Sequence, residues 1–185
     1  MRGKLRTLLV LGRVSNVPTV WSNCLAGWLL GGRGTVGGLV ALGLGTSLLY
    51  TGGMFLNDAF DADFDRKHRG ERPIPGGAAT EAEVWLWGSG LMTSGGLILV
   101  IGHQSTTLLT IALIGAILLY DALHKATILA PVLMGLCRFL LLVLAAAFGT
   151  AAGVDRLSLA SALVLALYVT GISYLARGES SGGRR

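Results

Sequence analysis

Apolar residues fill six long stretches of the chain, and charged residues are largely confined to the short segments between them. A bilayer core needs about 20 apolar residues per helical span. The pattern therefore predicts an all-α fold, a polytopic transmembrane helix bundle with about six spans. The first stretch is short and flanked by glycines. The stretches cover Pro18–Leu30, Val36–Phe60, Glu81–Ile101, Thr106–Leu123, Ile128–Thr150 and Leu157–Ala176.

Composition supports this interpretation. Of the 185 residues, 52% are hydrophobic and only 14% are charged, and the mean hydropathy is +0.67. A soluble domain carries about a quarter charged residues, so these values indicate a membrane protein. No long linker or strong repeat divides the chain, and we treat residues 1–185 as a single domain. Cys24 and Cys137 both lie inside predicted spans, where they are small apolar residues rather than a disulfide or a metal site.

The basic residues predict an orientation in the membrane. Most of them lie before the first span, between the second and third, between the fourth and fifth, and after the sixth. These segments share one side of the membrane, and the side with the excess of lysine and arginine is cytoplasmic. We therefore expect both termini and the polar loop after the second span to be cytoplasmic. The net charge of +5 follows from this topology and from contact with anionic membrane lipid, and needs no nucleic-acid partner.

The second span ends in a polar run, NDAFDADFDRKHRGERPIPGG, which begins at Asn57. Asn57, Asp61 and Asp65 are spaced by four residues, and four residues of helix rotate by about 400°, so the three side chains share one stripe. Asp58 lies beside that stripe, and Asp63 points elsewhere. Aligned oxygen atoms repel one another unless a cation lies between them, and Mg²⁺ takes carboxylates together with waters and substrate phosphates. The spacing therefore predicts a Mg²⁺ site at the end of the second span.

A basic run follows the aspartates and is able to hold a phosphate group. His68 and His124 lie beside the polar loops, and for both of them contact with a phosphate and exposure to water remain open. The competing interpretation of the whole segment is a solvated loop of mixed charge that merely ends a hydrophobic helix. The regular spacing favours a functional site, because ionisable residues at membrane depth are costly. The basic run comprises Arg66, Lys67, Arg69 and Arg72.

The motif N-D-x-x-D-x-x-x-D, followed by a basic loop and R-P-I-P-G-G, resembles the first aspartate-rich motif of the UbiA superfamily of intramembrane prenyltransferases. The segment LGRVSNVPTVWSNCLAGWLLGG resembles the opening helix of that family, with Arg13 and Asn16 at matching places. The segment LLYDALHK resembles its second cytoplasmic motif, with Tyr120 and Lys125. The resemblance extends over all six predicted spans, and the amino-acid sequence is most similar to that of the EboC-like branch.

This resemblance implies a helical bundle with a central cavity, built from the N-terminal two-thirds of the usual family length. It implies an integral membrane transferase that moves an isoprenyl group from an allylic diphosphate to an aromatic or other lipophilic acceptor, with Mg²⁺ as cofactor. Asn57, Asp61 and Asp65 would be the metal ligands, with Asp61 and Asp65 essential for catalysis. The implied substrate contacts are Arg13, Asn16, Asp58, Arg72, Tyr120 and Lys125.

Two further features bear on function. Arg138 lies well inside the fifth span, so we expect it to face the bundle interior and to bind a polar acceptor or an acidic group. The family carries a second D-x-x-x-D motif at the end of the sixth span, whereas here that span ends in SYLARGESSGG with Glu179 as its one acid. This departure leaves a second hypothesis open: a prenyl- or lipid-binding membrane subunit without catalytic turnover.

Overall fold

The computed structural model describes residues 2–150 and 154–182, and these residues form eight α-helices, two short 3-10 helices and no strand. The prediction of an all-α fold is therefore confirmed. The 3-10 helices are Val14–Asn16 and Gln104–Thr106. The α-helices are α1 (Arg2–Leu11), α2 (Val17–Leu30), α3 (Val36–Phe60), α4 (Ala62–His68), α5 (Glu81–Gly102), α6 (Thr107–Leu123), α7 (Ala130–Gly149) and α8 (Arg156–Gly182).

Five segments of the described chain are long and apolar enough to cross a membrane. They contain α3, α5, α6, α7 and α8, which match the second to sixth predicted stretches. The first predicted stretch forms α2, which has only 14 residues. At 1.5 Å per residue α2 is about 20 Å long, whereas a hydrocarbon core is about 30 Å thick. The chain is thus a multi-pass membrane protein, and its described part has five full-length helices and one shorter apolar helix.

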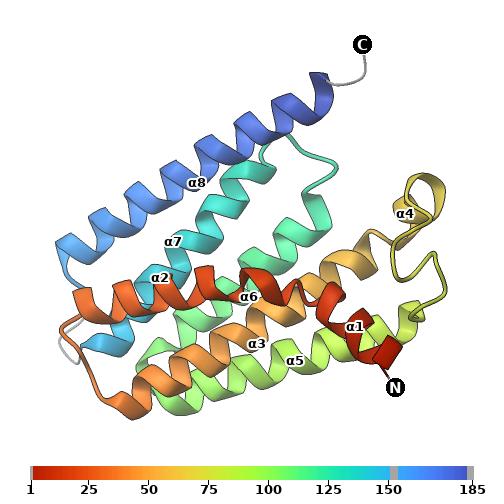
Figure 1. Ribbon diagram of the computed structural model, residues 1–185. Coiled ribbons are helices and arrows are strands. Elements are labelled where there is room, and N and C mark those ends of the chain that lie inside the picture. The colour runs from red at the N-terminus through yellow and green to blue at the C-terminus, as the bar shows by residue number, and fades with distance from the viewer. Residues whose placement is uncertain (1, 151–153, 183–185) are drawn as a thin grey trace.

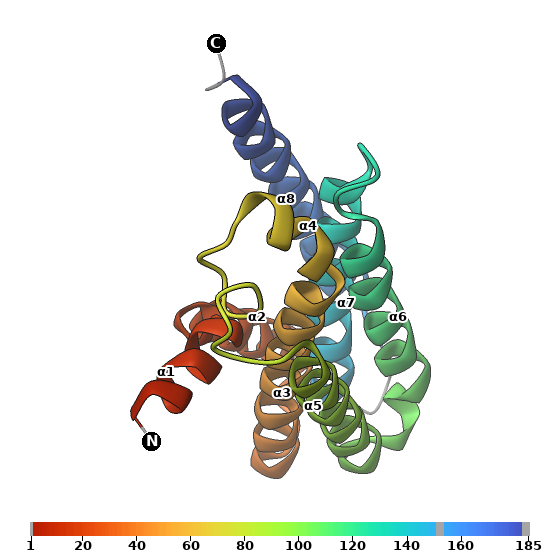
Figure 2. The same ribbon diagram turned by 90° about the vertical axis from the view of Figure 1, so that its right-hand side faces the viewer.

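The long helices run up and down the bundle (Figures 1 and 2). α5 packs along α3, and α7 packs against α2, α6 and α8. The end of α3, all of α4, the start of α5 and the end of α6 lie at one end of the bundle, together with the start of α1 and the end of α8 (Figure 1). We call this end the aspartate end, because it carries Asp61 and Asp65.

Glycines bring α3 and α5 into close backbone contact. A Cβ atom added to Gly95 would lie 2.6 Å from the carbonyl oxygen of Gly45, and one added to Gly52 would lie 2.8 Å from that of Gly88. Small residues let helices approach closely in a membrane, where van der Waals packing rather than the hydrophobic effect drives association. The glycine seam therefore holds α3, and with it the aspartate run, firmly against α5.

Helix caps fix the loop that joins α4 to α5. The Thr80 hydroxyl accepts a hydrogen bond from the Glu83 amide, and the Glu83 carboxylate accepts one from the Thr80 amide. Such a reciprocal cap satisfies two of the backbone N–H groups that a helix start leaves unpaired. The loop therefore ends at a defined point, the first turn of α5.

Candidate active site

The aspartate run stays helical across the boundary between α3 and α4. The Asp61 amide donates to the Asn57 carbonyl at 3.1 Å, and the Asp65 amide donates to the Asp61 carbonyl at 2.9 Å. This backbone ladder keeps Asn57, Asp61 and Asp65 on one stripe, as the four-residue spacing predicts, and all three are buried. Asp63 faces away from the stripe, and its side chain is 91% exposed.

Lys125, just beyond the end of α6, is the cation that the stripe holds. Its Nζ lies 2.8 Å from Asp61 Oδ1 and 3.9 Å from Asp65 Oδ1. The same ammonium group lies 3.8 Å from the centroid of the Phe64 ring, so two carboxylates and an aromatic face surround it. His124 adds a second contact, with Nε2 at 3.4 Å from Asp61 Oδ2. The sequence left the role of His124 open, and the structure brings it to the aspartates.

These contacts change the pKa values of Asp61 and His124. Burial alone would raise the pKa of Asp61, but hydrogen bonds from His124 and Lys125 outweigh it and hold that pKa below its ordinary value. Burial alone would lower the pKa of His124, but its hydrogen bond to Asp61 and the charge of that carboxylate raise the pKa instead. Each group thus favours the charged form of the other.

Asp58 gathers two arginines from distant parts of the chain. Arg13 Nη2 lies 3.2 Å from Asp58 Oδ1, and Arg72 Nη1 lies 3.3 Å from the same oxygen. Arg13 Nη2 also donates to Asn57 Oδ1 at 3.2 Å. Arg13 adopts a left-handed backbone conformation, with φ at 43°. A left-handed residue other than glycine costs about 1–3 kcal/mol and is characteristic of functional sites, where surrounding contacts hold it in place.

A further acid belongs to this cluster, and sequence reasoning did not single it out. Asp121 in α6 is buried, and its Oδ1 accepts a hydrogen bond from Asn57 Nδ2 at 3.1 Å. Its Oδ2 is buried without a hydrogen-bond partner within the described chain. A signal was present in the sequence, because Asp121 is an acid inside an otherwise apolar span.

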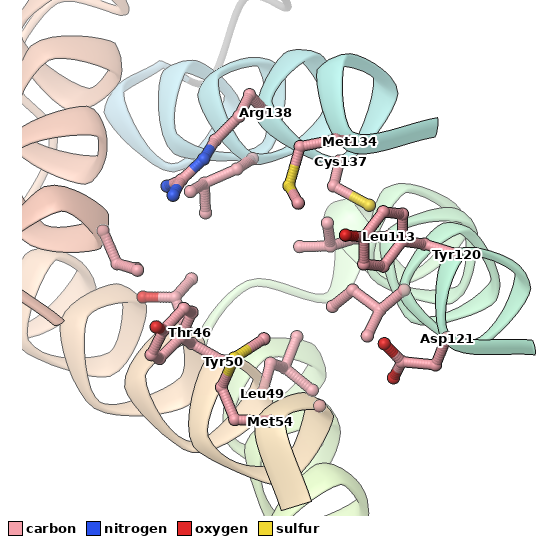
Figure 3. Close-up of a pocket in the computed structure, with 14 residues that line it drawn as sticks. Thr46, Leu49, Tyr50, Met54, Leu113, Tyr120, Asp121, Met134, Cys137 and Arg138 are labelled. Carbon is pink, nitrogen blue, oxygen red and sulfur yellow. The ribbon is translucent and has the colours of Figure 1, made fainter. Parts of the chain in front are cut away.

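An apolar cavity lies beneath the cluster, between α2, α3, α6 and α7 (Figure 3). Asp121 and Arg138 extend toward it from opposite sides, and Tyr120 also lines it. Arg138 is a half-buried member of the lining, and its Nη2 lies 3.5 Å from Oγ1 of the exposed Thr19 on α2. Tyr120 stacks on His124 with ring centroids 5.3 Å apart. The rest of the lining is mainly apolar and includes Val20, Leu49, Met54, Leu113, Ile117 and Leu141.

Arg66 ties α4 to the start of α5 on the outside of the cluster. Its guanidinium lies 2.7 Å from Asp63 and 2.5 Å from Glu81. Asn16, an expected substrate contact, is exposed at the start of α2 and makes no side-chain hydrogen bond to any described residue. The side chain of Glu179 lies outside the described residues.

The arrangement of acids bears on the predicted metal. Among the described residues, no group of three or more His, Cys, Asp or Glu side chains is already disposed to hold a metal ion. The aspartate stripe nevertheless has the chemistry that a divalent cation requires. Asp65 Oδ1 is buried and has no hydrogen-bond partner in the part of the chain that the structure describes, and a cationic group, the Lys125 ammonium, already lies between Asp61 and Asp65. Carboxylate and amide oxygens are also the ligands that Mg²⁺ prefers.

Comparison with known proteins places the chain in a family. The model of the UbiA prenyltransferase family matches residues 17–185. A solved structure from work on digeranylgeranylglyceryl phosphate synthase in membranes is similar, with a TM-score of 0.81 and 20% sequence identity; the alignment covers 99% of this chain and 65% of that one. At this identity the likeness shows the fold alone. A comparison with curated proteins gave no match. The family match covers most of the chain, which therefore belongs to the UbiA prenyltransferase family.

Proposed function

We propose that this chain is an integral membrane prenyltransferase. It transfers an isoprenyl group from an allylic diphosphate to a lipophilic or aromatic acceptor and depends on Mg²⁺. One observation carries the proposal: a buried aspartate stripe lies beside three cationic side chains and directly above an apolar cavity, and the hydrogen bond from Asn57 to Asp121 joins the two parts. The three cationic side chains are Arg13, Arg72 and Lys125.

Asn57, Asp61 and Asp65 would hold the metal through their side-chain oxygens. When bound, Mg²⁺ neutralises the negative charge that develops on the leaving diphosphate. The contacts of Lys125 support this assignment, because they indicate that Asp61 and Asp65 are arranged around positive charge. Asn57 uses its Oδ1 to accept from Arg13, and that oxygen has a second lone pair for a metal.

The cationic side chains would bind the diphosphate and stabilise it as the allylic C–O bond breaks. Arg13 and Arg72 each contact Asp58 through one terminal nitrogen. A guanidinium has five N–H donors, so both arginines keep donors for phosphate oxygens. Tyr120 adds a hydroxyl at the top of the cavity, beside His124. Fixed donors of this kind act on the charge of the transition state rather than on the substrate alone.

The cavity would take the prenyl chain and the acceptor. Its mainly apolar lining excludes water, which protects a developing allylic cation from hydrolysis. Arg138 supplies a cationic donor inside this lining and would hold a polar group of the acceptor. Asn16 lies outside the lining, at the start of α2, so its contact with substrate remains a prediction that the ligand-free geometry does not favour.

The aspartate end would face the cytoplasm. Arg66, Lys67, Arg69, Arg72 and Lys125 all lie in the segments that connect helices at this end. Lysine and arginine excess in short connections marks the cytoplasmic side of a membrane protein. Under this orientation a water-soluble diphosphate headgroup enters from the cytosol, while the prenyl chain stays in the bilayer.

A second candidate is a prenyl- or lipid-binding membrane subunit without turnover. One observation favours it: the described residues contain no ready-made group of three metal-binding side chains. The affiliation to the EboC-like branch is a separate prediction and does not decide between these two functions.

One experiment separates the candidates. Full-length protein in proteoliposomes is given labelled farnesyl or geranylgeranyl diphosphate, Mg²⁺ and a panel of lipophilic and aromatic acceptors. An enzyme forms prenylated product, and Asp61→Asn or Asp65→Asn lowers the rate on the order of 10²–10³-fold, the size expected for losing a group that stabilises transition-state charge. Asp63→Asn is the matched control. Mg²⁺-dependent binding without product supports the subunit, and absence of donor binding refutes both.

A further inference from the structure

Asp121 differs from the other aspartates of the cluster. Asp58, Asp61 and Asp65 each lie within 4.0 Å of a lysine or arginine nitrogen. Within the described chain Asp121 forms no such ion pair, although it is only 2% exposed. Its one hydrogen bond comes from the neutral amide of Asn57. A buried carboxylate without a cationic partner is costly, so a structural role alone does not account for it.

The position of Asp121 separates it from the diphosphate-binding end. Asp121 and Lys125 are four residues apart, so Asp121 lies about 6 Å further along the helix axis toward the membrane interior. Of the described acids, Asp121 lines the apolar cavity, whereas Asp61 and Asp65 lie outside its lining. In Figure 3 the Asp121 carboxylate points into the cavity. This depth corresponds to the first carbons of a prenyl chain whose diphosphate lies at Lys125.

We infer that Asp121 is a catalytic residue that receives the proton of the acceptor, and that the acceptor class carries an O–H or N–H at the reacting atom. The inference rests on the proposed function. Its geometric basis is the second carboxylate oxygen, Oδ2, which is buried without a hydrogen-bond partner among the described residues, while Asn57 fixes the first.

Prenyl transfer would move the proton of the acceptor as well as the prenyl group. The allylic C–O bond of the donor breaks, and its electron pair leaves with the diphosphate. A lone pair of the acceptor oxygen or nitrogen forms the new bond to the allylic carbon. The proton of that O–H or N–H passes to Asp121 Oδ2, and the carboxyl group later returns it to water. A carboxylate placed to accept this proton also orients the acceptor before the reaction.

A metal-binding role for Asp121 is the main competing explanation. Asp121 Oδ1 is taken by the Asn57 amide, and Asp121 lines the cavity, whereas Asp61 and Asp65 hold Lys125. The two explanations predict different metal affinities for a variant that lacks the Asp121 carboxylate. If Asp121 were a ligand, its removal would weaken binding of a divalent ion before any acceptor is present.

The test compares wild type, Asp121→Asn and Asp63→Asn in proteoliposomes. Asparagine keeps an oxygen for the Asn57 N–H but cannot take a proton from the acceptor. We expect Asp121→Asn to bind Mn²⁺ and the allylic diphosphate within about two-fold of wild type, and to transfer the prenyl group to long-chain alcohols and simple phenols about 10²–10⁴-fold more slowly, the range for losing a general base. Asp63→Asn should match wild type.

A phenol series distinguishes a base from a packing residue. 2,4-Dinitrophenol, which is ionised at neutral pH, needs no base, so Asp121→Asn should transfer to it within about ten-fold of wild type. A merely structural defect would slow all phenols equally. Asp121→Glu keeps a carboxylate and should retain partial activity with the less acidic phenols. Such activity would show that the loss in Asp121→Asn comes from the missing base and not from misfolding.

Several outcomes overturn the inference. These are Mn²⁺ affinity that falls in Asp121→Asn, an equal loss with all phenols, or a wild-type protein that binds donor but never prenylates an O–H or N–H acceptor. A wild-type protein that binds no donor with Mg²⁺ present refutes the proposed function itself, which is a different result.

Discussion

The ammonium group of Lys125 lies 2.8 Å from a carboxylate oxygen of Asp61, in the position where a metal-binding stripe needs positive charge. Asp65 and the ring of Phe64 complete its surroundings. A divalent ion bound by Asp61 and Asp65, as proposed, would compete with this ammonium group for the same oxygens. Lys125 is also one of the groups assigned to the diphosphate. Metal binding and donor binding would thus move Lys125 from carboxylate to phosphate.

This competition makes the two ligands respond in opposite directions to one substitution. Lys125→Gln should bind Mn²⁺ alone about ten-fold more tightly, because a charge-assisted contact is worth about 1.5 kcal/mol. The same variant should bind inorganic diphosphate with Mg²⁺ about ten-fold more weakly. Electron paramagnetic resonance of Mn²⁺ and calorimetry measure the two affinities. Lys67→Gln, an exposed lysine of α4, is the control, and unchanged Mn²⁺ affinity in Lys125→Gln would contradict the competition.

The glycine seam between α3 and α5 predicts a position-specific loss of stability. A Cβ on Gly95 would lie 2.6 Å from the Gly45 carbonyl oxygen and 2.9 Å from the Leu49 amide nitrogen, both of them backbone atoms. Gly95→Ala should therefore cost about 1–3 kcal/mol, the usual range for overpacking. Gly90→Ala, on the same helix with nothing within 4 Å, should be neutral or stabilising. Thermal unfolding in detergent compares the two, and equal melting temperatures would show that the helices are not in this close contact.

Asp58 should be a structural centre of the cluster. Its Oδ1 receives both Arg13 and Arg72, so Asp58→Asn leaves two guanidinium groups without their carboxylate. We expect a loss of about 1–3 kcal/mol of stability, reduced from the value for a fully buried pair because both arginines are partly exposed. Asp63→Asn, in an exposed pair with Arg66, should change stability by less than about 0.5 kcal/mol. A smaller effect at Asp58 than at Asp63 would refute this assignment.

The contact of His124 with Asp61 predicts a pH dependence in the ligand-free protein. Because the pKa of His124 is raised in the folded protein, its stabilisation of the fold is complete below the ordinary pKa of 6.5. This stabilisation is lost as the pH rises through the raised pKa. Because the pKa of Asp61 is lowered in the folded protein, its stabilisation of the fold is complete above the ordinary pKa of 3.8. This stabilisation is lost as the pH falls through the lowered pKa. The pair is therefore most stabilising between these two limits.

Melting temperature should consequently fall between pH 6 and pH 9 by about 2–4 °C more in wild type than in His124→Gln, the shift for about 1 kcal/mol in a chain of this size. His103→Gln, at the opposite end of the bundle from the aspartates, controls for the loss of a histidine. Parallel curves for wild type and His124→Gln would show that the pair contributes nothing.

Hydropathy and spacing predicted the fold better than the site. The predicted stretch Val36–Phe60 matches α3 residue for residue, because length and apolar content alone specify a spanning helix. The four-residue stripe also holds, since the backbone stays helical past Phe60. The α2 helix is shorter than a membrane span. The apolar pattern alone did not predict the left-handed backbone conformation of Arg13 that precedes this helix.

The partners within the site were beyond sequence reasoning. Asp61 and His124 meet only because α3 and α6 finish at the same end of the bundle, and such a contact between distant helices leaves no local pattern. Asp121 is an acid in an apolar helix, which marks it as unusual in the sequence. The resemblance to the family, however, pointed to its neighbour Tyr120. The hydrogen bond from Asn57 identifies its place in the cluster.

Arg66 has a consequence for how firmly α4 is held. Because its guanidinium holds Asp63 of α4 and Glu81 of α5 together, the short helix is tethered at its outer side as well as through the backbone. A movement of α4 away from the bundle must either break the contact between Arg66 and Glu81 or carry the first turn of α5 with it. Both side chains are partly exposed, so dissolved salt screens their attraction, and the link between the two helices weakens as the ionic strength rises.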